Sequence, residues 1–517
     1  MANAQPLLSF QRRVSWRNKH LNVERQVERL YDVWNRWSDG SRPNEHVWRA
    51  GLCALQQIVR DAEAQGRRVR ALGGAWSLSD AATTNDFMLN TKPLNCIDVG
   101  LSPKSLAPNF AGTKEHLVFT QCGASVLELN QVLEASGVAL PTTGASNGQT
   151  IAGAVATGTH GSAHQVGGMQ EFVVGLHLVC EGGKHYWLER ASRPVVSASF
   201  VALLGAELLR DDDVFDAALV SFGSFGIVHA LLLEVCPLYV LERHVRRHAF
   251  AEVEHALATL DVSALGLAHG ASLPFHFEVV INPYELASGQ GAYVRSLYKL
   301  PRPAPDLAPP PALQTRSDQG DDLLGVLGVL TDAVPAAIPS AVGTLASQQM
   351  KPVSFSIATP GQTFGTTGIR GDVLSMELSV APADVVAVVR CVAQVAREHT
   401  FAGLIAVRYV KASRALLAFT QDCIASPIVA TVELPCVGSA RTLEAFDRIW
   451  DALDRAGIRH ALHWGQCLPG TYGAARLRQL YGDRVDRWLA ARHRLLPSAA
   501  GRRRFANGFL ERLGLAD

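Results

Sequence analysis

Two glycine-rich stretches in the first half of the chain constrain its fold most. RALGGAWSLSD follows an apolar run near residue 70, and TTGASNGQTIAGAVATGTHGSAHQVGG covers residues 142–168. Glycine tolerates positive φ and lets the backbone approach a ligand closely, and successive turn N–H groups can bind phosphate. Neither a GxGxxG motif opening a helix nor a GxxxxGK[ST] motif is present, which excludes the usual Rossmann and P-loop interpretations. The residues alone leave open a plain loop or a different kind of nucleotide site.

The rest of the first half alternates short helices and strands. Apolar residues at helical spacing predict a helix over 48–64, and RRVRAL predicts a strand that runs into the glycine turn. A strand at 116–123 and a helix at 126–137 follow, and a long apolar, β-branched run ends near residue 243. We expect residues 1–42 to form an extension with a partly helical segment over 22–37, and residues 43–243 to form one domain.

The second half has a different pattern. Strands are predicted at 275–284, 373–382, 404–413 and 427–436, with helices at 320–334 and 383–398 and a proline-rich loop at 301–312. Strands mixed with helices in this order indicate an α+β domain with an antiparallel sheet, which we place at 244–455. The segment 456–517 is polar, arginine-rich and predicted to be helical. The predicted fold class is therefore α+β.

Composition excludes several classes of protein. Lys plus Arg number 48 against 47 Asp plus Glu, so the charge balance gives no sign of nucleic-acid binding. No stretch of eighteen apolar residues occurs, and the first residues lack an uninterrupted apolar run, so neither a membrane span nor a signal peptide is expected. The nine cysteines are scattered without a CxxC pair. This pattern favours reduced thiols in a cytoplasmic protein and gives no support for a metal site.

The order of the motifs resembles the vanillyl-alcohol oxidase superfamily, whose members carry a PCMH-type FAD-binding domain. RALGGAWSLSD, QTIAGAVATGTHGS and GSFGIVHALLLEV are similar to its FAD domain. The similarity to the aldonolactone and alditol oxidase branch extends to HFEVVINPY, AVRYVKASRALLAFTQ, HWGQ and FANGFLERLG. The resemblance implies a two-subdomain FAD-binding domain, a substrate (cap) domain with an antiparallel sheet, and a C-terminal tail that returns to the FAD domain.

The resemblance also implies how FAD is held. Trp76 stands where much of the family has a histidine bonded to the flavin, and an indole cannot form that bond, so non-covalent FAD is expected. The alternative is that Trp76 belongs to the core and His160 forms the link. The expected cofactor-binding residues are Gly73, Gly74, Ala75, Trp76, Ser77, Ser79, Ala145, Ser146, Thr150, Gly153, Thr157, Gly158, Thr159, His160 and Ile227.

The catalytic positions depart from the family pattern. The E-x-R strand reads Ala406-Val407-Arg408, so the arginine is kept and the acid is lost, and the HWGK lysine is Gln466. Replacement groups are sought among Glu433, Glu377, His276 and His463, with Arg408 and Glu433 favoured and Glu433 as general base. Glu377 also has a structural interpretation, because the family has an acid on the same strand.

These substitutions favour a small alcohol other than a sugar polyol as the substrate, in a less polar pocket. A small residue near Ala145 leaves a path for O2, which favours an oxidase that produces H2O2. Two alternatives remain: a sugar-lactone type flavin dehydrogenase with another electron acceptor, and a catalytically degenerate binding protein. No nucleic acid or membrane partner is expected.

Overall fold

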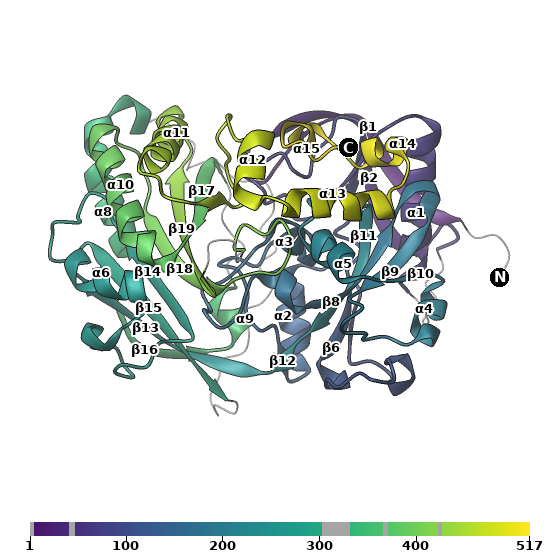
Figure 1. The fold of residues 1–517 in the computed structure, drawn as a ribbon, viewed down its shortest axis with the longest axis horizontal. Coiled ribbons are helices and arrows are strands. Elements are labelled where there is room, and N and C mark those ends of the chain that lie inside the picture. Colours follow the sequence, from purple (N-terminus) through teal and green to yellow (C-terminus); the bar gives the residue numbers. More distant parts are fainter. Residues whose placement is uncertain (1–4, 41–46, 302–330, 366–370, 422–425) are drawn as a thin grey trace.

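The computed structural model describes residues 5–40, 47–301, 331–365, 371–421 and 426–517. Its strands form three large sheets and one two-stranded sheet, with helices packed around them (Figure 1). The predicted loop at 301–312 and most of the predicted helix at 320–334 lie outside the described residues. The predicted α+β class is confirmed.

The first sheet contains a long N-terminal hairpin. Its order is β1-β2-β4-β3, in which β2 and β3 both run parallel to β4. The elements are β1 (Pro6–Arg17), β2 (Glu24–Trp37), β3 (Val69–Leu72), β4 (Phe87–Asn90) and the helix α1 (Arg49–Ala64). The partly helical segment predicted over residues 22–37 is wrong, since these residues form β2. The buried residues of β2 are two or four positions apart, as expected of a strand, in which every second side chain faces the same side: Val27, Tyr31, Val33 and Asn35.

The second sheet has six strands in the order β10-β9-β8-β11-β6-β5. Two short strands, β7 (Val138–Ala139) and β12 (Cys236–Pro237), pair beside it. The six strands are β5 (Ile97–Val99), β6 (Leu117–Gln121), β8 (Val173–Val179), β9 (His185–Glu189), β10 (Glu207–Arg210) and β11 (Ile227–Glu234). The helices of this part are α2 (Val126–Ala135), α3 (Ile151–Thr157), α4 (Ala198–Leu204) and α5 (Asp212–Leu219).

The third sheet has eight strands, and all its pairings are antiparallel, as predicted. Its order is β16-β13-β15-β14-β18-β19-β17-β20, and helices cover its outer face (Figure 1). The strands are β13 (Tyr239–His248), β14 (His276–Ile281), β15 (Ala292–Pro301), β16 (Val353–Ala358), β17 (Val373–Val380), β18 (Ile405–Lys411), β19 (Ile428–Val437) and β20 (Ala461–Leu462). The helices are α6 (Phe250–Thr259), α8 (Ile338–Gln349), α9 (Pro360–Thr363), α10 (Val385–Glu398) and α11 (Ala440–Arg455).

The C-terminal segment returns to the first half of the chain (Figure 1). Arg492 Nε donates to the Ser224 carbonyl at 3.1 Å, and Arg70 NH1 donates to the Phe505 carbonyl at 2.7 Å. Its helices are α12 (Ala474–Tyr481), α13 (Arg484–Leu495), α14 (Ala499–Arg504) and α15 (Gly508–Arg512). The domain boundaries at 42, 243 and 455 stay predictions, although residue 243 lies inside β13 and β2 pairs with β4.

Two further features bear on the sequence-based expectations. Among the described residues, no helix combines the length and the apolar character needed to cross a membrane. The eight cysteines in this part of the chain are free thiols, and Cys423 lies outside the described residues.

A chain of three histidines crosses three strands of the six-stranded sheet; His177 and His229 are buried and His185 is partly exposed. His177 Nδ1 lies 2.9 Å from His229 Nδ1, and His177 Nε2 lies 2.9 Å from His185 Nδ1. His229 Nε2 is 3.0 Å from Gln121 Nε2. Burial, the largest cause, lowers the pKa of His229 to about 3 and holds the pKa of His177 well below its usual range. The folded protein therefore keeps these rings neutral.

Acidification is expected to destabilise the protein through these rings. The unfolded chain takes up protons near the ordinary histidine pKa of 6.5, whereas the folded chain does so only near 3 at His229. Their contribution is thus complete above pH 6.5 and decreases as the pH falls below that value. Thermal unfolding followed between about pH 7.5 and pH 5 should show a falling Tm. His177→Gln should flatten this decrease, and His255→Gln, on the surface, should not; a pH-independent Tm in the unmodified protein would contradict the account.

Candidate functional site

The loop that follows β3 forms a tight turn into which no side chain fits at Gly73. A Cβ atom on Gly73 would lie 1.9 Å from Thr150 Oγ1, and one on Gly74 would lie 2.6 Å from the Gly148 carbonyl oxygen. Ala75 has a φ of +55°. The turn is therefore held against the second glycine-rich segment, with its backbone close to the space between them.

This turn lines the first of two hollows, which we call the first hollow. It encloses about 1010 Å³ of empty space between the turn, α3, the loop 222–226 and the N-terminal hairpin. Ten of the predicted cofactor-binding residues line it: Gly73, Gly74, Ala75, Trp76, Ser77, Ser79, Thr150, Gly153, Thr157 and Thr159. The prediction missed Trp16 and Asn18, which reach the hollow from the hairpin, and Phe222, which has a φ of +54°.

The second hollow, of about 900 Å³, adjoins the first. Five residues line both hollows, so the two are neighbours: Trp76, Ser77, Gln149, Thr157 and Thr159. The predicted residues Ala145, Ser146 and His160 line the second hollow. Gly158 and Ile227 line neither: Gly158 ends α3 with a φ of +78°, and Ile227 is 1% exposed in the core.

Trp76 lies where the two hollows meet. A Cβ atom on Gly148 would be 2.3 Å from its Cζ2 atom, so the indole packs directly on that backbone. The Lys19 ammonium lies 4.0 Å from the ring centroid, and the His20 ring meets the indole edge-on at 5.7 Å. Burial first, and then the adjacent Lys19, lower the pKa of His20 to about 4, so that ring is neutral at pH 7.

The first hollow fits FAD in its residues. The glycine turn offers backbone N–H groups without obstructing side chains, which suits a pyrophosphate. Gln149 lines both hollows, and its buried Oε1 atom has no hydrogen-bond partner. The two polar side-chain atoms of Asn147 are also buried without a hydrogen-bond partner. Buried polar atoms without partners are costly unless a ligand satisfies them. The Ser79 hydroxyl, by contrast, donates to the Trp464 carbonyl at 2.6 Å.

A row of charged side chains crosses four strands of the eight-stranded sheet at the second hollow. Glu278 on β14 is opposite Arg408 on β18, Ala406 on β18 is opposite Glu433 on β19, and Glu433 is opposite Glu377 on β17. Residues directly opposite each other, and those two apart on one strand, point to the same face. The register therefore gathers three carboxylates around one guanidinium.

Arg408 is bonded to two of these carboxylates. Its Nε atom donates to Glu278 Oε1 at 2.8 Å and its NH1 atom donates to Glu433 Oε2 at 2.5 Å, while Glu377 Oε1 lies 3.7 Å away. Although burial acts in the opposite direction, these carboxylates raise the pKa of Arg408 above its usual range. Arg295 and Arg408 likewise outweigh burial and lower the pKa of Glu278 to about 2. The network is charged at neutral pH.

Glu433 lies opposite the position at which the E-x-R strand lacks its acid. It faces Ala406 across the strand pair, and its Oε1 atom accepts from Ser375 Oγ at 3.1 Å and from Gln466 Nε2 at 3.4 Å. The predicted catalytic residues Arg408, Glu433, Gln466 and Glu377 all line the second hollow. The hollow combines these charged side chains with apolar surface, and the less polar pocket expected from the sequence stays a prediction.

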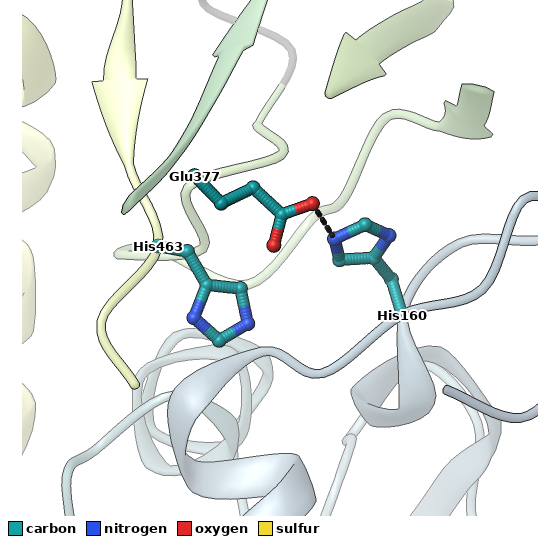
Figure 2. A group of neighbouring side chains, drawn as sticks. All are labelled: His160, Glu377 and His463. Atoms are coloured by element: carbon teal, nitrogen blue, oxygen red, sulfur yellow. Dashed lines mark ion pairs between the residues drawn. The ribbon is translucent and has the colours of Figure 1, made fainter. Parts of the chain in front are cut away.

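His160, Glu377 and His463 form a buried group at the same place (Figure 2). His160 Nε2 lies 3.0 Å from Glu377 Oε1, and His160 Nδ1 lies 2.8 Å from the Gly161 carbonyl oxygen. Burial acts to lower the pKa of His160, but Glu377 outweighs it and raises that pKa; the pKa of Glu377 is lowered to about 2. Both ring nitrogens of His160 are therefore engaged.

His463 differs from His160 in the direction in which its pKa is shifted. Burial lowers its pKa to about 4, and its Nδ1 atom accepts a hydrogen bond from the Gly465 N–H at 3.0 Å. The neutral ring consequently carries its proton on Nε2. His276, the remaining sequence candidate, is buried on β14 and lines neither hollow.

Sequence reasoning missed Glu278 and Arg295, which complete the charged row. Arg295 NH1 lies 2.7 Å from Glu278 Oε2, and the two residues are opposite each other on β15 and β14. Glu278 could have been noticed as a charged residue inside the apolar strand HFEVVI. Its partners Arg295 and Arg408 could not, because they depend on which strands pair.

Comparisons with known proteins agree with the geometry. Residues 50–189 match the family model described as an FAD binding domain. The chain is 27% identical over 279 residues to an L-gulono-1,4-lactone dehydrogenase of Mycobacterium tuberculosis, covering 53% of this chain and 54% of the relative. It is 31% identical over 209 residues to a D-arabinono-1,4-lactone oxidase of Eremothecium gossypii, covering 40% and 35%. The chain thus spans about half the length of the first relative and about a third of the second.

Solved structures share the fold over nearly the whole chain. Cholesterol oxidase from Brevibacterium sterolicum superposes with a TM-score of 0.71 at 12% identity, covering 98% of this chain and 97% of that one. Xylooligosaccharide oxidase from Myceliophthora thermophila gives a TM-score of 0.59 at 14% identity, covering 93% and 91%. Residues 50–189 thus match an FAD-binding domain, and nearly the whole chain shares its fold with solved oxidases.

Proposed function

We propose that the protein is an FAD-dependent oxidoreductase that oxidises a CH–OH carbon of a small molecule. The observation that carries this proposal is that the two hollows adjoin: the glycine turn suited to pyrophosphate lines one, the charged row around Arg408 lines the other, and Trp76 lines both. When bound, FAD supplies the hydride acceptor for such an oxidation. The protein's own residues then have to orient the hydroxyl group and accept its proton.

Glu433 and Arg408 fit these two tasks. A carboxylate accepts the hydrogen bond of a substrate hydroxyl and then its proton, and a fixed guanidinium stabilises the negative charge that develops on oxygen. Arg408 is held by Glu278, so it stays in place while Glu433 takes up and releases a proton. Gln466 and Ser375 fix the orientation of the carboxylate from the other side.

The exchange of Glu433 for Gln tests the proposed general base. Gln keeps the shape and one acceptor oxygen but cannot take up the proton, so turnover should fall by about 10²–10⁴-fold. The matched control is Glu444→Gln on α11, because Glu444 is half-exposed and pairs with Arg448 on the surface. Steady-state kinetics with the substrate found by screening would decide; turnover of Glu433→Gln within twofold of the unmodified enzyme would refute the role.

The substrate we propose is a small alcohol other than a sugar polyol. Support comes from the hydrogen-bonding pattern rather than from low polarity. The acid lies on β19 instead of β18, and a neutral amide, Gln466, stands at the position of the family's lysine. A polyol bound as in the family would therefore meet an acid, Glu433, from a different strand. It would also lack the positive charge of the lysine that Gln466 replaces.

We also propose that O2 is the electron acceptor, so that H2O2 is formed. Gly144, Ala145 and Ser146, which are small, line the second hollow. The alternative, a dehydrogenase with another acceptor, is kept because one relative carries that name. Photoreduced protein mixed with air separates the two: flavin absorbance should recover within seconds for an oxidase, and slow recovery would favour the dehydrogenase.

FAD is proposed to bind non-covalently. Trp76 occupies the position at which a histidine would be needed, and both nitrogens of His160, the alternative attachment point, are engaged by Glu377 and the Gly161 carbonyl. A ring nitrogen that is already held in a hydrogen bond is not available to attack the flavin.

A further inference from the structure

A second group of convergent side chains lies in the eight-stranded sheet, outside both hollows. His244 Nε2 lies 2.6 Å from Glu242 Oε1, and His269 Nε2 lies 3.0 Å from the same oxygen atom. Glu242 and His244 are on β13, and His269 is in the segment between α6 and β14. Two imidazole nitrogens and one carboxylate oxygen thus point at a common place.

The surroundings hold the three groups in this arrangement. Glu242 and His244 are two residues apart on an extended strand, so they share one face. The His269 ring stacks on Tyr298 with centroids 4.0 Å apart, and the His244 ring meets Tyr298 edge-on at 6.1 Å. Glu242 Oε1 lies within hydrogen-bonding distance of both rings, so the carboxylate faces both histidines.

We propose that Glu242, His244 and His269 bind a divalent transition-metal ion of the Zn²⁺ class. Two histidines and one carboxylate are a ligand set that Zn²⁺ takes, with bonds of about 2.0–2.2 Å. Such bonds place tetrahedral ligand atoms roughly 3.3 Å apart, and the three atoms here lie within 4.8 Å of one another. The His269 side chain is 40% exposed, against 8% for His244, so the site opens to solvent on one side and leaves the fourth position to water.

Two features of the chain set the expected behaviour of this site. Arg246 is on the same face of β13, which weakens cation binding, although its guanidinium is turned to the carbonyl of Gly266. The ion would tie β13 to the segment that precedes β14, because its ligands come from both. Binding to the folded chain alone then raises Tm as the metal concentration increases.

The sequence alone provided no support for a metal site, since its scattered cysteines include no CxxC pair. Among the described residues, His160, Glu377 and His463 form the other group of this composition. There the Arg408 guanidinium lies 3.7 Å from the ligand oxygen of Glu377, and the group belongs to the second hollow. We do not propose that this group binds a metal ion, so a variant in it serves as an internal control.

The test is Co²⁺ and Zn²⁺ titration of the chelator-treated, FAD-loaded chain. Co²⁺ absorption reports tetrahedral coordination, and competition with a chromophoric chelator gives the affinity for Zn²⁺. One equivalent is expected to bind, and His269→Ala and Glu242→Gln should each weaken binding at least tenfold. His248→Ala is the matched control, since His248 pairs with Glu252 near the end of the same strand without a third ligand; it and His463→Ala should keep the site.

Several results would overturn the proposal. These are no binding to the unmodified chain, binding that survives both His269→Ala and Glu242→Gln, and binding that is lost in His463→Ala but kept in His269→Ala. Because the His269 side chain is partly exposed, the His269→Ala variant is expected to fold, and circular dichroism would check this. If Glu242→Gln fails to fold, His269→Ala decides alone.

Discussion

Arg408→Ala should abolish most turnover and also destabilise the protein. The substitution removes the cation that bonds Glu278 and Glu433 and lies near Glu377, so Glu433 loses its ion pair and Glu278 keeps Arg295 alone. Breaking a buried ion pair from one side costs about 3–5 kcal/mol of folding free energy. Loss of a group that stabilises developing charge lowers turnover by about 10²–10³-fold. The two effects are expected together because one side chain has both roles.

Matched variants separate these two effects. Arg295→Ala removes a partner of the same Glu278 without touching the second hollow, so it should lower Tm and leave turnover much less affected. Arg408→Lys keeps the charge but cannot bond both carboxylates through a planar fork, so it should restore stability in part and turnover poorly. An Arg408→Ala variant that loses stability but turns over normally would refute its role at the reacting oxygen.

Gly73→Ala should prevent FAD from binding. The new Cβ atom would lie 1.9 Å from Thr150 Oγ1 and 2.9 Å from Thr150 Cβ, so the turn and the start of α3 must move apart. We expect a colourless protein and an FAD dissociation constant raised at least about a hundredfold, or about 2.7 kcal/mol. Absorbance at purification and titration with FAD measure both.

The control for this change is Gly470→Ala, where a Cβ atom meets nothing within 4 Å. That variant should bind FAD like the unmodified protein. Circular dichroism should show that Gly73→Ala is folded, since the clash is confined to one turn. Stoichiometric FAD in Gly73→Ala would contradict the placement of the pyrophosphate at this turn.

Local sequence patterns predicted most of the regular elements. The helices α1, α2 and α10 and the strands β6, β14, β17, β18 and β19 follow from apolar spacing, because their buried faces repeat with the period of the element. The N-terminal hairpin was missed. In β2, Glu and Arg residues, which have good helix propensity, interrupt the alternation of buried and exposed residues. The strand pairs in parallel with β4, which lies far along the chain and gives no local signal.

The candidate site was predictable in its residues but not in its register. Arg408, Glu433, Glu377 and Gln466 were singled out from motifs, and the structure brings all four to one hollow. That Glu433 stands opposite Ala406, and that Glu278 anchors Arg408, depends on which strands are neighbours. Such pairing cannot be inferred from local sequence. For the same reason Trp16 and Asn18 were not expected at the first hollow.

The absorption spectrum of the purified protein, taken before and after acid precipitation, tests the central claim most directly. The account predicts a flavin spectrum at about one FAD per chain that passes entirely into the supernatant, because Trp76 cannot bond the flavin and both nitrogens of His160 are engaged. A yellow pellet would contradict non-covalent binding. A colourless protein that also fails to take up added FAD would contradict the proposed function itself.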